Sequence, residues 1–169
     1  MVHVTFKENP VTLLGTEVAA GDKAPDFTVL SNDLKPVTLN DSKGKIRLIS
    51  VVPSLDTGVC SEQTRKFNEE ALSLGDDVEV LTISVDLPFA QARWTAAEDV
   101  KNVKTLSDHR DLSFGEAYGV AIKELRLLAR SIFVIGKDDK VAYVEYVQEV
   151  TNHPDYDKAI EEVKKLTNE

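Results

Sequence analysis

The sequence contains a single cysteine, Cys60, among its 169 residues. One cysteine excludes an internal disulfide, a Cys-x-x-Cys redox pair and a zinc site built on several thiolates. The histidines His3, His109 and His153 are scattered without the spacing of metal ligands. No glycine-rich loop follows a strand-like segment, which argues against a phosphate-binding loop. We therefore expect no bound metal and no other cofactor.

Long apolar runs and an excess of positive charge are also missing. No window of eighteen apolar residues occurs, so we expect no transmembrane helix. Residues 1–10 are polar, without the apolar core of a secretory signal. The 29 acidic residues outnumber the 20 Lys and Arg, and the net charge of −9 disfavours binding to nucleic acid or to an anionic membrane. A cytoplasmic protein fits these features.

The composition is that of a folded protein, with 42% hydrophobic residues. The length suits one domain that buries a core without disulfides or metals. No repeat, low-complexity stretch or Pro/Gly/Ser-rich linker interrupts the chain. We therefore predict a single domain over residues 1–169.

Hydrophobic patterning predicts an alternation of strands and helices. The opening segments 2–6 and 11–14 predict a β-hairpin with its turn at 8–10. Asp86 and Pro88 open a helix whose apolar face would consist of Leu87, Ala90, Trp94 and Ala97. The other predicted strands are 27–30, 37–39, 46–53, 78–85, 104–106, 131–135 and 141–147, and the other predicted helices are 59–74, 112–118 and one that begins at Pro154.

The order of these elements predicts the fold class. Residues 46–53 form an apolar run too continuous for a strand with one wet face, so we expect a central strand covered on both sides. Early alternation implies a parallel βαβ unit, and the late hairpin adds antiparallel strands. This is the order of a thioredoxin-like α/β fold: a mixed central sheet flanked by helices, here with an N-terminal β-hairpin.

Cys60 lies just after the predicted central strand, in the first turn of a predicted helix. The thiolate is the nucleophilic form of cysteine, and helix N-termini or nearby cations can lower a cysteine pKa from about 8.5 to roughly 3.5–7.5. Most lone cysteines are small buried hydrophobic residues. The polar, constrained turn before Cys60 favours chemistry over simple packing.

The residues around Cys60 resemble a known active-site loop. Residues 53–60 read Pro-Ser-Leu-Asp-Thr-Gly-Val-Cys and are similar to the peroxiredoxin loop in the form found in bacterial thiol peroxidases. The spacing of proline, threonine and cysteine is highly specific, and the resemblance covers nearly the whole chain. It extends over residues 21–27, 84–91, 127–131 and the N-terminal hairpin.

This resemblance implies a thiol peroxidase that reduces hydrogen peroxide and organic hydroperoxides. Cys60 would be the peroxidatic cysteine, which attacks the peroxide and becomes a sulfenic acid. Thr57 would hydrogen-bond the sulfur and the peroxide, Pro53 would shield the pocket from water, and Arg130 would keep the thiolate charged and hold the peroxide oxygens. The resemblance also implies a homodimer that receives electrons from thioredoxin or another thiol reductant.

One position departs from the family. Thiol peroxidases usually carry a second, resolving cysteine, and here Thr95 occupies that position, after Trp94. A natural one-cysteine enzyme and a replaced cysteine both fit this sequence. In either case an outside thiol must resolve the Cys60 sulfenic acid: a small thiol, a thioredoxin-type protein or Cys60 of another subunit. Further oxidation to sulfinic acid competes with that step.

Two other classes of function remain open at this stage. A non-enzymatic peroxide sensor could use the same pocket and report the oxidation of Cys60 to another protein. A binding module on the same fold could carry an inert cysteine.

Overall fold

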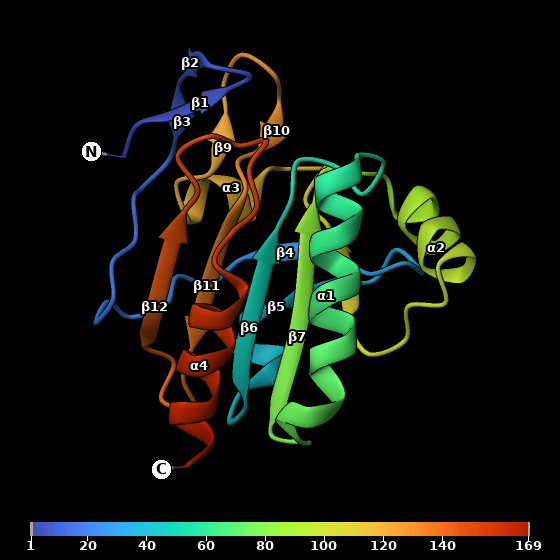
Figure 1. Ribbon diagram of the computed structural model, residues 1–169, viewed down its shortest axis with the longest axis vertical. Helices are drawn as coiled ribbons and strands as arrows, with labels where there is room; N and C mark the ends of the chain where they lie inside the picture. The colour runs from blue at the N-terminus through green and yellow to red at the C-terminus, as the bar shows by residue number, and fades with distance from the viewer. Residues whose placement is uncertain (1, 169) are drawn as a thin grey trace.

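The centre of the fold is a seven-stranded mixed sheet (Figure 1), seen in a computed structural model that describes residues 2–168. The strands β6, β7 and β8 are parallel to one another, and the remaining neighbours pair antiparallel. In sheet order the strands are β12 (Val141–Tyr146), β11 (Ser131–Ile135), β6 (Ile46–Val51), β7 (Val78–Ser84), β8 (Lys104–Ser107), β4 (Thr28–Leu30) and β5 (Pro36–Thr38).

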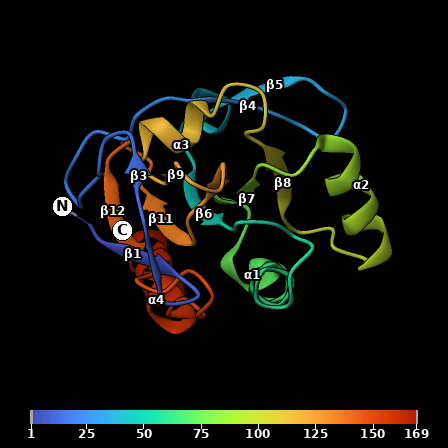
Figure 2. The same cartoon turned by 90° about the horizontal axis from the view of Figure 1, so that it is seen from above.

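Helices cover both faces of this sheet (Figure 2). Helices α1 (Gly58–Leu74) and α4 (Tyr156–Thr167) lie side by side on one face. The short helix α3 (Ser113–Ala117) lies on the other face, and α2 (Pro88–Ala97) packs beside β8. A 3-10 helix, η1 (Leu39–Ser42), follows β5. The mixed sheet with flanking helices confirms the predicted fold class.

The apolar pattern correctly located the centre of the sheet. Every residue of β6 is buried, as is every residue of β11. A strand covered by helices on both faces has no wet side, so its sequence does not alternate between apolar and polar residues. The carboxyl end of β6 leads directly into the loop that carries Cys60.

The N-terminal strands lie at the carboxyl end of β6 (Figure 1). Strands β1 (Val4–Phe6) and β2 (Asn9–Val11) form the predicted hairpin, and β3 (Leu13–Leu14) joins β9 (Ala121–Ile122) and β10 (Leu127–Leu128) in a small sheet. The turn was misplaced: it consists of Lys7 and Glu8, both with positive φ (50° and 69°). Asn9 and Pro10 are inside β2.

The predicted apolar face of α2 is correct only at Trp94, which is half-buried and packs against the core. Leu87 is 52% exposed, and Ala90 and Ala97 are also exposed. The buried residue at the centre of this helix is polar: Gln91, whose side-chain amide donates to Ser84 Oγ (3.0 Å) and to the carbonyl oxygen of Leu106 (2.9 Å). A hydropathy pattern cannot anticipate a buried amide whose partners lie on two different strands.

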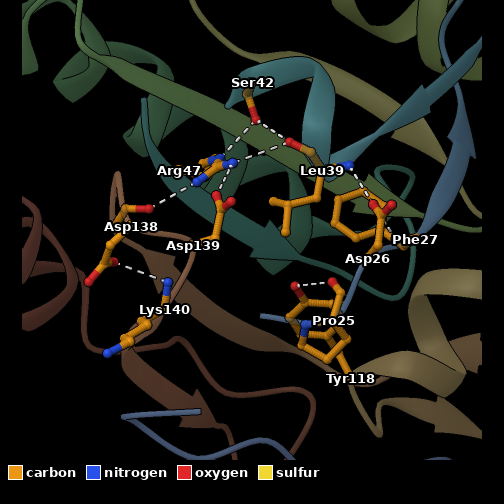
Figure 3. Close-up of polar contacts among 11 residues, drawn as sticks. Pro25, Asp26, Phe27, Leu39, Ser42, Arg47, Tyr118, Asp138, Asp139 and Lys140 are labelled. Atoms are coloured by element: carbon orange, nitrogen blue, oxygen red, sulfur yellow. Dashed lines mark hydrogen bonds and ion pairs between the residues drawn. The ribbon is translucent and has the colours of Figure 1, made fainter. Parts of the chain in front are cut away.

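A fully buried arginine, Arg47, anchors the amino end of β6 (Figure 3). Its guanidinium contacts the Asp139 carboxylate at 2.7 Å and donates to Ser42 Oγ (2.9 Å) and to the carbonyl oxygens of Gly136 (2.9 Å) and Leu39 (3.3 Å). These partners come from η1 and from the turn between β11 and β12, so Arg47 ties both to the central strand.

Within residues 2–168, no helix combines the length and apolar character needed to cross a membrane.

Candidate active site

Asp86 holds the loop that carries Cys60. Its carboxylate accepts hydrogen bonds from Ser54 Oγ (2.7 Å) and from the backbone N–H of Leu55 (2.8 Å). The parallel strands β6 and β7 end at the same edge of the sheet, which brings these two loops together. Asp86 was expected to cap α2, but the N-cap of that helix is Leu87, without a side-chain cap.

Cys60 is fully buried in the first turn of α1. Its side chain packs in a small apolar cluster with Val52 and Leu55, and Trp94 of α2 packs against this cluster. The first four N–H groups of a helix lack partners within the helix and carry partial positive charge. The sulfur therefore lies in a water-excluded place at the positively polarised end of the helix.

Arg130, which directly precedes β11, supplies the cation of the site. Its Nη2 donates to Cys60 Sγ at 3.2 Å. Its other donors reach neutral acceptors: Nε donates to the carbonyl oxygen of Val150 (2.7 Å) and Nη1 to Gln63 Oε1 (2.8 Å). Arg130 is only 3% exposed, and no carboxylate of residues 2–168 lies within 4.0 Å of its guanidinium. Its charge is thus directed at the sulfur.

Gln63 is a site residue that the sequence analysis missed. It is fully buried, and its Nε2 donates to Ser50 Oγ (2.7 Å) while its Oε1 accepts from Arg130. Gln63 thereby fixes the guanidinium from the helix side. A signal was available, since residues three apart on a helix share a face, and Gln63 follows Cys60 by three.

Thr57 and Pro53 lie in the wall of a cavity beside the sulfur. Thr57 is the N-cap residue of α1, and its exposed side chain donates to the carbonyl oxygen of Ser54 (3.2 Å). Pro53 is buried. The structure thus brings Cys60 and Arg130 into direct contact and places Thr57 and Pro53, together with Arg130, in the wall of one cavity.

The cavity has a volume of about 400 Å³, and most of its surface is apolar. Its lining comes from the Cys60 loop, from Arg130 and from the tip of the β1–β2 hairpin. Six of the residues that line it are Phe6, Lys7, Pro53, Thr57, Leu127 and Arg130.

Thr95 lies near the end of α2, half-buried, and its hydroxyl donates to the carbonyl oxygen of Ala92 (3.0 Å). This is an ordinary hydrogen bond within a helix. Among residues 2–168, no group of three or more His, Cys, Asp or Glu side chains is placed to hold a metal ion, so the three histidines belong to no such group.

A buried thiol at a helix N-terminus, with a guanidinium on its sulfur and a thioredoxin-like sheet beneath it, defines a thiol-based oxidoreductase. Comparison with known proteins narrows this class. The redoxin family model matches residues 19–160. Thiol peroxidase of Halalkalibacterium halodurans is 73% identical over 164 residues, which cover 97% of this chain and 98% of that protein. Thiol peroxidase of Bacillus subtilis is 64% identical over 166 residues, covering 98% and 99%.

A solved structure agrees with the sequence relatives. The crystal structure of a peroxiredoxin-like protein from Aquifex aeolicus superposes with a TM-score of 0.92 at 43% identity, covering 98% of each chain. The chain belongs to the redoxin family and, within it, to the thiol peroxidases of the peroxiredoxin type. It is therefore an enzyme that reduces peroxides with electrons from thiols.

Proposed function

We propose that Cys60 is the peroxidatic cysteine and that Arg130 holds it in its reactive form. The observation that carries this proposal is the 3.2 Å contact between Arg130 Nη2 and Cys60 Sγ, made by a guanidinium that faces no carboxylate. A cation next to a thiol favours the thiolate over the neutral form. The helix N-terminus acts in the same direction.

The first chemical step converts Cys60 to a sulfenic acid. The thiolate sulfur forms a bond to one peroxide oxygen, and the O–O bond breaks. The sulfur is oxidised by two electrons, the peroxide is reduced by two, and the leaving oxygen takes up a proton to become water or an alcohol. Negative charge develops on that leaving oxygen, so the fixed N–H donors of Arg130 lower the barrier.

Thr57 and Pro53 complete this proposal. The Thr57 hydroxyl lines the cavity, and rotation of the side chain away from Ser54 would direct it to a bound peroxide and to the sulfur. Pro53 carries no backbone N–H, so at the buried end of the loop it closes the pocket without a donor that would attract water. The cavity is large enough for organic hydroperoxides as well as hydrogen peroxide.

The second half of the cycle requires an external thiol, because Thr95 stands where the family carries its resolving cysteine. The incoming thiol would attack the sulfenic sulfur to give a mixed disulfide and water. A second thiol would then release Cys60 and leave as a disulfide. We propose thioredoxin or a small thiol as this reductant.

Intact-mass measurement of the purified chain tests the function directly. One equivalent of peroxide should add one oxygen atom to Cys60, and a thiol reductant should remove it over many turnovers. Cys60→Ser, which is close in size, should keep the fold and lose the activity completely. Turnover in that variant would refute the assignment. Stoichiometric oxidation that no thiol reductant reverses would instead support the peroxide sensor.

Thr95→Cys tests the assignment of the resolving position. After peroxide, the double-cysteine chain should lose two hydrogens as Cys60 and the introduced cysteine form a disulfide. The two Cα atoms must then come within roughly 4.4–6.8 Å, so the helices that carry them must partly unwind. Thr95→Ser is the matched control. Accumulation of sulfinic acid at the parent rate, with the introduced thiol still free, would contradict the assignment.

The finer expectations of the sequence also remain proposals. We propose a homodimer, a cytoplasmic location and one domain over residues 1–169. The exposed Leu87 and Phe89 (64% exposed), close in sequence to Asp86, offer an apolar surface for dimer contacts. Light scattering on the purified chain measures the oligomeric state.

A further inference from the structure

The cavity beside Cys60 differs in charge from the rest of the molecule. The chain carries a net charge of −9, yet among residues 2–168 the only ionisable side chains that line this cavity are those of Arg130 and Lys7. The volume of about 400 Å³ is also far more than hydrogen peroxide needs, since one water molecule occupies roughly 30 Å³ in the liquid. It lies in the range of small-molecule sites, about 300–1,000 Å³.

Lys7 is not neutralised by a neighbouring acid. Its Nζ lies 5.8 Å from the centre of the Phe6 ring. Among residues 2–168, no carboxylate lies within 4.0 Å of this Nζ. The acid packed against the hairpin tip, Glu149, is already engaged, because its oxygens accept from the side chains of Thr5 and Thr151 and from nearby backbone N–H groups.

Glu149 instead fixes the position of Lys7. It accepts hydrogen bonds from the backbone N–H groups of Lys7 (3.2 Å) and Glu8 (2.7 Å). These bonds hold a two-residue turn with positive φ at both positions, which non-glycine residues seldom adopt. Desolvation is the largest single influence on the Glu149 carboxyl and raises its pKa, but the hydrogen bonds from Thr151, Glu8 and Thr5 together lower the pKa to about 2, so the clamp stays ionised at neutral pH.

The same segment also holds Arg130. The backbone of β1 pairs with residues 148–150, since Thr5 N donates to Gln148 O (2.7 Å) and Val150 N to Thr5 O (2.8 Å). The carbonyl oxygen of Val150 accepts from Arg130 Nε. One stretch of chain therefore positions both cations of the cavity, one at the reacting sulfur and one at the hairpin tip.

We infer that Lys7 is a specificity-determining residue that selects organic hydroperoxides carrying a carboxylate. This inference rests on the proposed function of Cys60. The peroxide group would lie against Cys60 and Arg130, the carbon chain along the apolar wall of Phe6 and Leu127, and the carboxylate at the Lys7 ammonium.

The test uses a matched pair of substrates, a straight-chain ω-hydroperoxy carboxylic acid and its primary amide. Stopped-flow rates of Cys60 oxidation are measured for both at low salt, and their ratio is the readout. An exposed ion pair contributes about 0.2–1 kcal/mol, so the unmodified chain should prefer the acid by up to about fivefold. Added salt should reduce this preference.

Variants at Lys7 isolate its contribution. Lys7→Gln should bring the ratio close to one, Lys7→Glu should invert it, and Lys7→Arg should restore it. The turn survives these changes because only the backbone of Lys7 contacts Glu149. Lys43→Gln is the control: it removes an exposed lysine after η1 and should leave the ratio unchanged, which separates a local contact from the effect of net charge.

Two results would overturn the inference: equal rates for acid and amide in the unmodified chain, or a preference for the acid that persists in Lys7→Glu. Neither result would contradict the proposed function, because the reaction of Cys60 with hydrogen peroxide tests that function separately. If the unmodified chain failed to form a sulfenic acid with hydrogen peroxide, the function itself would fail.

Discussion

Two buried arginines lie at opposite ends of one pair of strands. Arg47 is at the amino end of β6, where it pairs with Ile135 of β11. Arg130 directly precedes Ser131, which pairs with Val51 at the other end of β6. Both side chains are almost completely buried, and both use several donors to bind backbone or side-chain oxygens.

They differ in the charge of their partners. Arg47 contacts the Asp139 carboxylate, so its charge is compensated and its hydrogen bonds join segments of the fold. Arg130 is held by a carbonyl and an amide, both neutral, and its third contact is sulfur. A buried arginine whose partners are neutral keeps its charge for a bound anion or a reacting group. We therefore propose that the same residue type is structural at one end and takes part in the chemistry at the other.

Arg47→Met should cost the most stability. It leaves the Asp139 carboxylate without its cation and removes one of two donors from each of the carbonyl oxygens of Gly136 and Leu39. Breaking a buried ion pair costs about 3–5 kcal/mol, and the lower end applies because Asp139 is 33% exposed. Urea unfolding measures the loss, and the folded variant should oxidise Cys60 at the parent rate. A variant as stable as the parent would show that the cluster contributes little.

Asp108 extends the comparison to a buried carboxylate that forms no ion pair with any residue in the range 2–168. It accepts from the backbone N–H groups of Phe114 (3.0 Å) and Gly115 (2.8 Å) at the start of α3, and burial raises its pKa to about 6. Between pH of about 4 and 6 the folded chain then binds more protons here than the unfolded chain. The free energy of unfolding should therefore fall as pH rises through this window, by up to about 3 kcal/mol.

Asp108→Asn provides the measurement. The carboxamide does not titrate, so the difference in unfolding free energy between parent and variant should change between pH of about 4 and 7. Parallel stability curves would show that the pKa of Asp108 is the same in both states.

Arg130→Met should act on rate more than on stability. Without the cation, Cys60 should react with peroxide at least about tenfold more slowly, which is about 1.4 kcal/mol of transition-state stabilisation. The pH at which Cys60 becomes reactive should also rise. Stopped-flow rates across pH decide this. An unchanged rate and pH profile would make Arg130 a structural residue like Arg47.

Gln63→Glu should give Arg130 a carboxylate partner of the kind that Arg47 has. A carboxylate in place of Oε1 would compensate the Arg130 charge as Asp139 compensates that of Arg47. Oxidation of Cys60 at neutral pH should slow by about threefold to tenfold, and the rate should recover at higher pH. Gln63→Met, which removes the amide without adding charge, is the control. Equal pH profiles for the two variants would show that compensation of charge is unimportant here.

Part of this protein could be predicted from its sequence. The continuous apolar run of β6, the helical spacing of α1 and the alternation of elements indicated the fold, because burial and periodicity are properties of neighbouring residues. Resemblance of residues 53–60 to a known loop identified Cys60, Thr57 and Pro53 as candidates and led to Arg130. No single one of these residues indicated its function alone.

The tertiary structure determined the hydrogen-bond partners of the site residues and of the loops around them. Gln63 holds Arg130 from 67 positions away, Asp86 holds the Cys60 loop across 31 and Glu149 holds the hairpin tip across more than 140. Gln91, a polar residue, is buried because its side-chain amide reaches Ser84 and the carbonyl oxygen of Leu106. Sequence by itself determined which segments are apolar and where strands and helices form. Hydrogen bonds between distant residues depend on how the strands pair and how the helices pack on them, and only this arrangement gives Arg47 a carboxylate partner and Arg130 neutral ones.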